Sequence, residues 1–330
     1  MFSRKPSKIS IDVTNRCNSR CITCNIWKHE KEDDLDIKYI YKFVTQILRL
    51  SGPKLINLAG GEPLLREDIF DIIKFINKKG GKVRLITNGL LLNKENIDKL
   101  ASSGLSRLNI SINSMNPEIH DKSRGISGNL EIIKKAVEYI RRNHQRIKLE
   151  INMVLFKDNL DEVVPVIKYA HKNHANLSIQ PIQIIYDKAF AKNDESKFLF
   201  DDLGKLKQTL LTIQRYKKKG HKIYLPDSFI QRYINYYKNP NKPKSCNIGN
   251  FKLTLYNNGN MNFCFSHKPI GNIFDNSVKK AWNSSIALRN RKMMRKCNIK
   301  CASFCNIQPT FSDNIKEARL FIMRKIKNAF

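Results

Sequence analysis

The chain has 330 residues, of which 41% are hydrophobic and 9% aromatic; this composition excludes a disordered protein and allows a sizeable folded core. Its formal net charge is +31, but lysine occurs along the whole chain, so the charge fits either a solvated lysine-rich surface or an anionic partner. The N-terminal segment MFSRKPSKIS lacks the apolar region of a signal peptide, and no segment reaches the length of an apolar membrane span. We therefore expect a cytoplasmic protein with reduced cysteines, which favour metal ligation or catalysis over disulfides.

Short β-like runs alternate with helical patterns over the first half of the chain. Predicted strands cover Lys8–Thr14, Lys54–Ala59, Lys82–Thr87, Arg107–Ile112, Ile147–Phe156 and Asn176–Ile184. Predicted helices cover Leu35–Leu50, Glu67–Lys79, Asn93–Ser102, Asn129–Arg142 and Asp161–His174. Six β/α repeats of this kind predict a parallel sheet with helices on its outside.

The predicted strands alternate apolar and polar residues. In the first strand Ile9 and Ile11 face one way, and Ser10 and Asp12 face the other. A parallel strand buried on both faces is normally apolar throughout, and the interior of a closed barrel is apolar too. The polar face therefore predicts an α/β fold with an open, partial (β/α)6 TIM-like barrel, whose lumen holds a polar ligand. Lumen candidates from this pattern are Asp12, Asn57, Glu150, Asn152, Ser178 and Gln180.

The pattern changes after the sixth repeat. A core domain over residues 1–190 is followed by a helical connection over residues 191–243, which ends in the boundary sequence Asn239–Pro243. A small α+β domain is then predicted over residues 244–310, and a basic helix that lies on the barrel over residues 311–330.

The small domain is predicted from a hairpin and a helix. The segment FKLTLYNNGNMNFCF has a turn sequence at Asn257–Gly259 between two strand-like runs, as in a β-hairpin. A helical pattern follows near Ser277–Arg295.

Three cysteines, Cys17, Cys21 and Cys24, follow the first predicted strand. Active sites of β/α proteins lie at the carboxyl ends of the strands, and closely spaced thiolates suit zinc or an iron–sulfur cluster. A structural zinc site needs four protein ligands, yet no fourth cysteine is near and His29 is the nearest histidine. Three thiolates on a four-iron cluster would instead leave one iron open to a substrate or cofactor.

Further motifs stand at the ends of the next strands. AGGEP ends the second strand, where its glycines permit a close approach of the backbone to a ligand. ITNG ends the third, SINS ends the fourth, and HDKSRG follows. With the C-x3-C-x2-C spacing, this series resembles the radical S-adenosylmethionine (SAM) superfamily.

The resemblance implies that the three cysteines ligate a [4Fe–4S] cluster whose open iron binds SAM. It also implies SAM contacts by Gly60, Gly61, Glu62, Pro63, Thr87, Asn88, Ser111 and Arg124. The chain departs from the family at Thr23, where an aromatic residue is frequent and Trp27 is the nearest substitute, and at Asn113, where many members have aspartate.

A second cysteine group stands near the C-terminus, and the thiols could hold either zinc or an iron–sulfur cluster. Its spacing resembles the SPASM/twitch extension of radical SAM enzymes, and five cysteines suffice for one auxiliary [4Fe–4S] cluster with one to spare. The group comprises Cys246, Cys264, Cys297, Cys301 and Cys305, and the spare ligand is one of the last three.

The resemblance implies an oxidoreductase or maturase that cleaves SAM reductively and abstracts hydrogen from a peptide or small-molecule substrate. Its expected electron donor is a flavodoxin or ferredoxin. The net charge leaves an RNA-modifying enzyme as an alternative, although no RNA-binding motif is present. A non-catalytic electron-transfer protein is a further alternative, but it would need neither the GGEP segment nor a polar lumen. No general base is identified.

Overall fold

The computed structural model describes residues 5–28, 30, 33–52, 54–182, 200–239, 246–297 and 301. Its strands form one ten-stranded sheet in the order β10-β9-β8-β1-β2-β3-β4-β5-β6-β7. From β8 through β7 all neighbouring strands are parallel, and the hairpin strands β9 and β10 are antiparallel. The strands are β1 (Lys8–Thr14), β2 (Leu55–Gly60), β3 (Lys82–Thr87), β4 (Arg107–Ser111), β5 (Lys148–Leu155), β6 (Asn176–Pro181), β7 (Ile223–Tyr224), β8 (Lys252–Leu255), β9 (Asn260–Asn262) and β10 (Gly271–Asn272).

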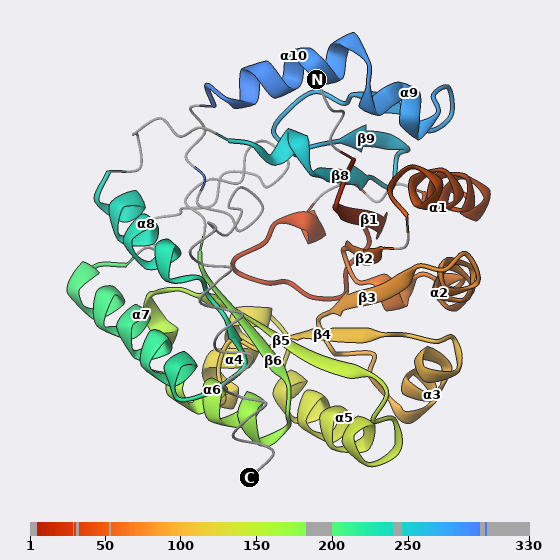
Figure 1. The fold of residues 1–330 in the computed structure, drawn as a ribbon. Helices are drawn as coiled ribbons and strands as arrows, with labels where there is room; N and C mark the ends of the chain where they lie inside the picture. The colour runs from red at the N-terminus through yellow and green to blue at the C-terminus, as the bar shows by residue number, and fades with distance from the viewer. Residues whose placement is uncertain are drawn as a thin grey trace.

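Helices surround the parallel part of this sheet, and the strands lie inside them (Figure 1). The helices are α1 (Ile37–Ser51), α2 (Ile69–Lys78), α3 (Lys94–Ser102), α4 (Pro117–Arg124), α5 (Asn129–Asn143), α6 (Val163–Lys172), α7 (Leu203–Lys218), α8 (Asp227–Lys238), α9 (Val278–Trp282) and α10 (Ser285–Met294). The open sheet with outer helices confirms the predicted partial barrel.

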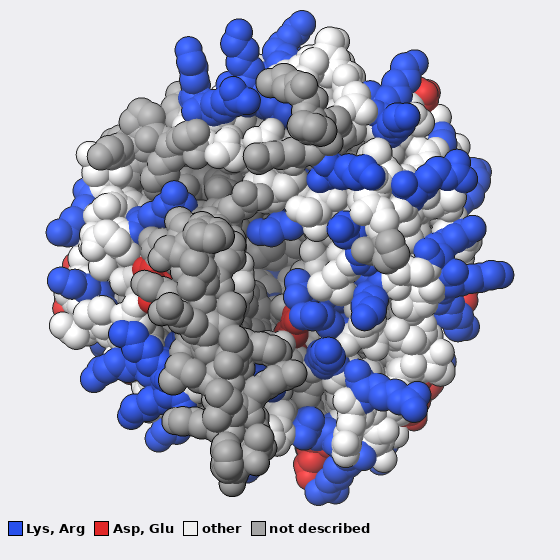
Figure 2. Space-filling model, in the orientation of Figure 1, with Lys and Arg blue, Asp and Glu red and all other residues white. Residues whose placement is uncertain are grey.

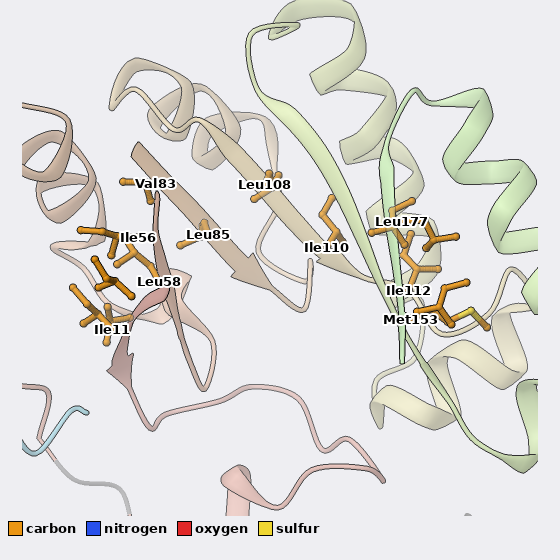
Figure 3. Close-up of a cluster of buried hydrophobic side chains, with 14 of the residues drawn as sticks. Ile11, Ile56, Leu58, Val83, Leu85, Leu108, Ile110, Ile112, Met153 and Leu177 are labelled. Carbon is orange, nitrogen blue, oxygen red and sulfur yellow. The ribbon is translucent and has the colours of Figure 1, made fainter. Parts of the chain in front are cut away.

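The apolar face of each strand packs against the helices. Ile11, Ile56 and Leu108 are at most 1% exposed and join one continuous core with helix residues such as Phe43 and Ile73. Figure 3 shows these strand side chains together, from neighbouring strands. Burial of this apolar face is the main favourable term in folding such a sheet. On the other face, polar side chains of neighbouring strands contact one another: Asn57 donates to Ser10, and Arg84 binds Asn57 and Glu150, as the predicted alternation requires.

The six predicted core strands are all present, within a few residues of their expected ends. The sixth ends at Pro181, and residues 183 and 184 of its predicted span lie outside the described residues. Among the α-helices and strands, three were not predicted: the helix α4, the two-residue strand β7 inside the expected helical connection, and the two-residue strand β10. The single helix predicted near 277–295 is divided at Asn283 and Ser284 into α9 and α10. Residues 240–243 of the predicted boundary sequence and the predicted C-terminal helix at 311–330 lie outside the described residues.

The predicted hairpin is present as β8 and β9, but it extends the barrel sheet, because β8 pairs in parallel with β1. Side chains of α1 add to this junction. Lys42 Nζ donates to the Ile273 carbonyl at 2.7 Å, and Gln46 Oε1 accepts from the Val278 N–H at 2.7 Å. The C-terminal elements are thus joined to the barrel through the sheet and through α1. Of the helices described, none has both the length and the apolar composition needed to cross a bilayer.

Candidate active site

Cys17, Cys21 and Cys24 lie on the loop that leaves the carboxyl end of β1. Cys21 is buried, and the other two are half-buried. Burial raises the pKa of Cys17 to about 11 and raises the pKa of Cys24, and in both cases the neighbouring thiols raise it further. The three thiols on this loop therefore interact electrostatically. A metal binds thiolates and offsets this cost of ionisation, so the donor set fits an iron–sulfur cluster.

Helix α4 holds the cysteine loop through its last carbonyls. The Arg20 and Ile22 N–H groups donate to the Arg124 and Ser123 carbonyls, each at 3.1 Å. The Ser19 hydroxyl also donates to the Arg124 carbonyl, at 3.0 Å. The carbonyls at a helix end have no partner within the helix. Donors of the cysteine loop therefore supply the hydrogen bonds that the last carbonyls of α4 lack. The HDKSRG motif therefore positions the cysteines through its backbone, which sequence reasoning did not anticipate.

Trp27 closes the other side of the same loop. Its indole N–H lies 2.9 Å from the Cys24 carbonyl and 3.3 Å from the Cys21 carbonyl. The sequence pattern suggested Trp27 as a substitute for a missing aromatic residue. In the structure its polar edge fixes the backbone between two of the cysteines.

Gly60 and Gly61 of the GGEP segment approach the cysteine loop itself, and not only a ligand as we expected. A Cβ at Gly60 would lie 2.2 Å from the Thr14 carbonyl oxygen, and one at Gly61 would lie 2.0 Å from the Arg16 carbonyl oxygen. The Gly61 N–H donates to Thr14 and the Glu62 N–H donates to Arg16, both at 2.8 Å. The absence of side chains thus allows β2 to bind the segment that leads to Cys17.

Glu62 is fully buried and binds the end of β3. Its carboxylate accepts from the Thr87 hydroxyl at 2.8 Å, the Asn88 N–H at 2.8 Å and the Leu64 N–H at 3.2 Å. Burial raises the pKa of Glu62, while these hydrogen bonds and Arg124 act to lower it. The predicted residues Glu62, Thr87 and Asn88 therefore come together. Pro63 is buried beside them, at the first position of a short 3-10 helix.

Arg124 and Ser111 also face this region. Burial raises the pKa of both Glu62 and Cys24, and the positive charge of Arg124 acts to lower each pKa, so Arg124 interacts electrostatically with both groups. The buried Arg124 Nε has no hydrogen-bond partner among the described residues. Ser111 is 9% exposed at the carboxyl end of β4, beside Asn152 of β5. An anionic ligand group would satisfy this buried guanidinium atom.

A buried polar network fixes α4 to β4. The Asn113 N–H donates to His120 Nδ1 at 3.2 Å, and His120 Nε2 lies 3.0 Å from Asn129 Oδ1. The Asn113 amide donates to the Ser123 hydroxyl at 3.0 Å and accepts from the Val154 N–H at 3.1 Å. Asn113 thus acts as both donor and acceptor, and an ionised aspartate at this position could only accept. Burial lowers the pKa of His120 to about 4, so its ring is neutral at physiological pH.

The lumen face of the barrel carries a charged cluster. Glu150 pairs with Arg84 at 2.5 Å and with Arg107 at 2.7 Å, and Arg84 also donates to Asn57 at 3.3 Å. Nearer the cysteine loop, burial raises the pKa of Asp12 to about 6, and the charge of Lys252 limits the rise. The lumen is thus polar and contains a carboxyl group that can exchange a proton near neutral pH.

The second cysteine group is also brought together. The Met294 carbonyl accepts from the N–H groups of both Cys246 and Cys297, each at 3.1 Å. Burial raises the pKa of Cys246 to about 12, and the thiols of Cys264, Cys297 and Cys301 add to the rise. Four thiols therefore converge, while Cys305 lies outside the described residues. Among the described ranges, no three His, Cys, Asp or Glu side chains lie close enough together to hold a metal ion.

Comparisons with known proteins agree with this geometry. Residues 11–170 match the radical SAM superfamily, and residues 246–306 match the SPASM iron–sulfur cluster-binding domain. The AdoMet-dependent heme synthase of Methanosarcina barkeri is 26% identical over 320 residues, which cover 91% of this chain and 88% of that protein. The GTP 3',8-cyclase of Clostridium perfringens is 34% identical over 187 residues, which cover 53% of this chain and 55% of that protein.

Two solved structures have the same fold. Streptococcus suis SuiB bound to S-adenosylmethionine has a TM-score of 0.70 at 15% identity, over 89% of this chain and 72% of that chain. Native anSMEcpe with bound AdoMet has a TM-score of 0.67 at 15% identity, over 98% of each chain. The chain therefore belongs to the radical SAM superfamily: it is an enzyme that uses SAM and a SAM-binding [4Fe–4S] cluster, and it carries a C-terminal SPASM domain with an auxiliary iron–sulfur cluster.

Proposed function

We propose that Cys17, Cys21 and Cys24 hold the SAM-binding cluster, and that the substrate binds in the polar lumen below it. When bound, the cluster and SAM supply a 5′-deoxyadenosyl radical that takes a hydrogen atom from the substrate. The observation that carries the proposal is the convergence of the cysteine loop, the buried Glu62 and the Arg124 guanidinium at the carboxyl ends of β1, β2 and β3.

The residues of this chain have separate roles in that proposal. Arg124 binds the carboxylate of SAM, because its buried Nε has no partner among the described residues. Glu62 orients the loops after β2 and β3. Its Oε2 atom accepts only the Asn88 N–H, so it has capacity to accept a further hydrogen bond from the amino group of SAM. Asp12 is the leading candidate for taking up a proton from the substrate, since its carboxyl group lies on the lumen face and titrates near neutral pH.

A small polar molecule is the leading substrate class. The two curated relatives are named for a heme synthase and a GTP cyclase, and the lumen offers charged groups that bind polar substituents. A peptide is the second candidate, because SuiB of the same fold has been solved with its precursor peptide SuiA. On the described part of the face shown in Figure 2, Lys and Arg are spread over many elements, as a generally basic surface would be, and this spread does not favour an RNA substrate.

SAM cleavage tests the first cluster. The iron-loaded protein, reduced with dithionite in place of a flavodoxin or ferredoxin donor, should release 5′-deoxyadenosine from SAM. Cys17→Ala, Cys21→Ala and Cys24→Ala should each abolish the release, whereas Thr23→Ala in the same loop should retain it. Release by any of the three cysteine variants would overturn the ligand assignment.

We further propose that Cys246, Cys264 and two of Cys297, Cys301 and Cys305 ligate the auxiliary cluster. A variant without the three N-terminal cysteines should keep about four irons per chain, and its Mössbauer spectrum should not respond to SAM. Replacing Cys246 or Cys264 by alanine in that variant should remove the iron, whereas one of the single alanine variants at Cys297, Cys301 and Cys305 should retain it. Zinc in place of iron would overturn this assignment and leave the first cluster unaffected.

The division into a core at 1–190, a connection at 191–243, an auxiliary domain at 244–310 and a tail at 311–330 is part of this proposal. The described elements that support it are α7 and α8 within the connection and the convergent thiols within the auxiliary domain.

A further inference from the structure

A second cavity lies at the opposite end of the barrel from the cysteine loop. It has a volume of about 880 Å³ and is formed where β3, β4 and β5 begin, between the α3–β4 turn and the α5–β5 loop. Because β1 and these strands are parallel, the loop that bears Cys17 leaves the other edge of the sheet. The cavity is therefore separate from the proposed SAM site, although Arg107, which lines it, also pairs with Glu150 in the lumen cluster.

The side chains that line this cavity are unusually basic. Across the chain, Lys and Arg outnumber Asp and Glu by 60 to 29, but no acidic residue lines the cavity. Six of its lining residues are basic: Lys82, Arg107, Arg142, His144, Arg146 and Lys148. The general excess of Lys and Arg along the chain accounts for part of this charge, so the argument depends on which of the six side chains lack a carboxylate partner.

Three of the six basic side chains are already paired with carboxylates outside the lining. Arg107 pairs with Glu150 at 2.7 Å, Arg142 with Glu138 at 2.5 Å and His144 with Asp98 at 2.6 Å. For the other three, Lys82, Arg146 and Lys148, the described part of the chain provides no carboxylate partner. All three are exposed. Their mutual repulsion across one cavity is relieved by a bound anion.

The wall of the cavity is held in place by hydrogen bonds. The Asn77 amide, from α2, donates to the Ser103 and Gly104 carbonyls at 3.0 and 2.9 Å. A Cβ at Gly104 would lie 2.7 Å from that amide nitrogen, so a glycine is needed for this contact. The Lys148 N–H donates to the Ser106 carbonyl at 3.1 Å. Because this wall is already ordered, less conformational entropy is lost when a ligand binds.

We propose that this cavity binds a small molecule that carries two or more phosphate groups. Lys82, Arg146 and Lys148 supply the charge, and the Ser106 hydroxyl and the Gln145 amide are neutral donors in the same lining. The cavity volume falls within the roughly 300–1,000 Å³ range of small-ligand sites. An RNA backbone would instead require cations along an extended track, so a compact polyphosphate is the better fit. The inference does not depend on the proposed substrate site.

Calorimetric titration of the iron-loaded full-length protein with sodium tripolyphosphate tests the proposal. At about 0.15 M salt the screening length is about 8 Å, so lysines elsewhere contribute little to binding in the cavity. We expect one tripolyphosphate per chain, bound more tightly than inorganic phosphate. The triple variant Lys82→Ala, Arg146→Ala, Lys148→Ala should lose about tenfold or more in affinity.

A matched triple variant removes the same charge elsewhere. Lys172→Ala, Lys207→Ala, Lys292→Ala changes three exposed lysines outside the cavity and should keep the wild-type affinity. If both triple variants lose the same affinity for tripolyphosphate, or if several equivalent tripolyphosphate ions bind per chain, the binding is general charge attraction and the proposal is wrong. Preferential loss of affinity for a short single-stranded RNA in the cavity variant would also overturn it. Lys148→Glu alone should repeat the loss and so exclude a folding defect of the triple variant.

Discussion

Replacement of Gly61 by alanine would place a methyl group inside the backbone of the cysteine loop. On the present backbone its Cβ would stand 2.0 Å from the Arg16 carbonyl oxygen and 2.6 Å from the carbonyl carbon, whereas real Cβ contacts are essentially never shorter than 3.0 Å. The loop must therefore move away from β2 by about 1 Å or more. This movement stretches the 2.8 Å hydrogen bonds from Gly61 to Thr14 and from Glu62 to Arg16. Overpacking and two weakened hydrogen bonds together should cost about 2–6 kcal/mol.

The assay is urea denaturation of the iron-loaded protein, together with SAM cleavage after reduction. Gly204→Ala is the matched control, because its Cβ would meet only the flexible Asp202 carboxylate, at 3.0 Å, near the start of α7. That variant should be neutral or more stable by up to about 1 kcal/mol, since alanine favours a helix. The Gly61 variant should unfold at lower urea and lose most SAM cleavage, because the segment that leads to Cys17 is displaced. An unfolding midpoint and a cleavage rate equal to those of the control would refute the reasoning.

Three further predictions concern buried charge and polar contacts. The pKa of Asp12 is about 6 in the folded chain and 3.8 in the reference state, so the folded chain holds this proton more tightly. The free energy of unfolding should therefore fall by up to about 3 kcal/mol as pH rises from 4 to 6. Asp12→Asn should remove this slope from urea midpoints, whereas Lys252→Met should steepen it; an unchanged slope in the Asn variant would contradict the assignment. The pKa of His120 is about 4 against 6.5, so its contribution to stability is lost as pH falls from 6.5 to 4. His120→Phe should flatten that part of the profile and cost about 1–3 kcal/mol at pH 7 through lost hydrogen bonds; a profile of wild-type shape would argue against a buried neutral ring. Glu150→Gln leaves two lumen arginines unpaired and should cost about 1–3 kcal/mol in the same assay, whereas the exposed Glu138→Gln should cost less than about 0.5 kcal/mol; equal effects would show that the lumen cluster is not buried enough to matter.

Local patterns predicted the barrel because each of its core strands has one apolar and one polar face. The alternation of Ile9 and Ile11 with Ser10 and Asp12 was enough to assign the inner face. The pairing of β8 with β1 could not be predicted, because it joins segments more than 240 residues apart. Parallel strands are also not joined by a short turn whose sequence could indicate the pairing. The strand β7 has only two residues, too few for a period to be visible.

Helix α4 was missed although its ends carry ordinary signals. Asn116 caps its first turn, Pro117 is the first helical residue, and Gly125 ends it in the left-handed region at φ 65°. Its interior is polar because the helix buries hydrogen-bonding groups such as His120 and Ser123, and not an apolar stripe. A search for apolar periodicity cannot detect such a helix.

The motifs named the residues of the candidate site, but they did not reveal the contacts. Gly61 and Trp27 proved to contact the backbone of the cysteine loop, where sequence reasoning had looked toward ligands. The missing information is tertiary: which carbonyl meets which N–H depends on how β1, β2 and α4 pack, and no single segment encodes that packing.

The pairing of β8 with β1 also determines what can be removed from the protein. With β8 in place, the N–H and C=O groups along that side of β1 are satisfied by a neighbouring strand. A chain shortened to residue 243 would expose this row as an open edge next to the cysteine loop, and exposed edges of this kind recruit other chains. The auxiliary domain therefore acts as the side wall of the barrel as well as a cluster carrier, and the shortened chain should aggregate before the loss of its cluster can be measured.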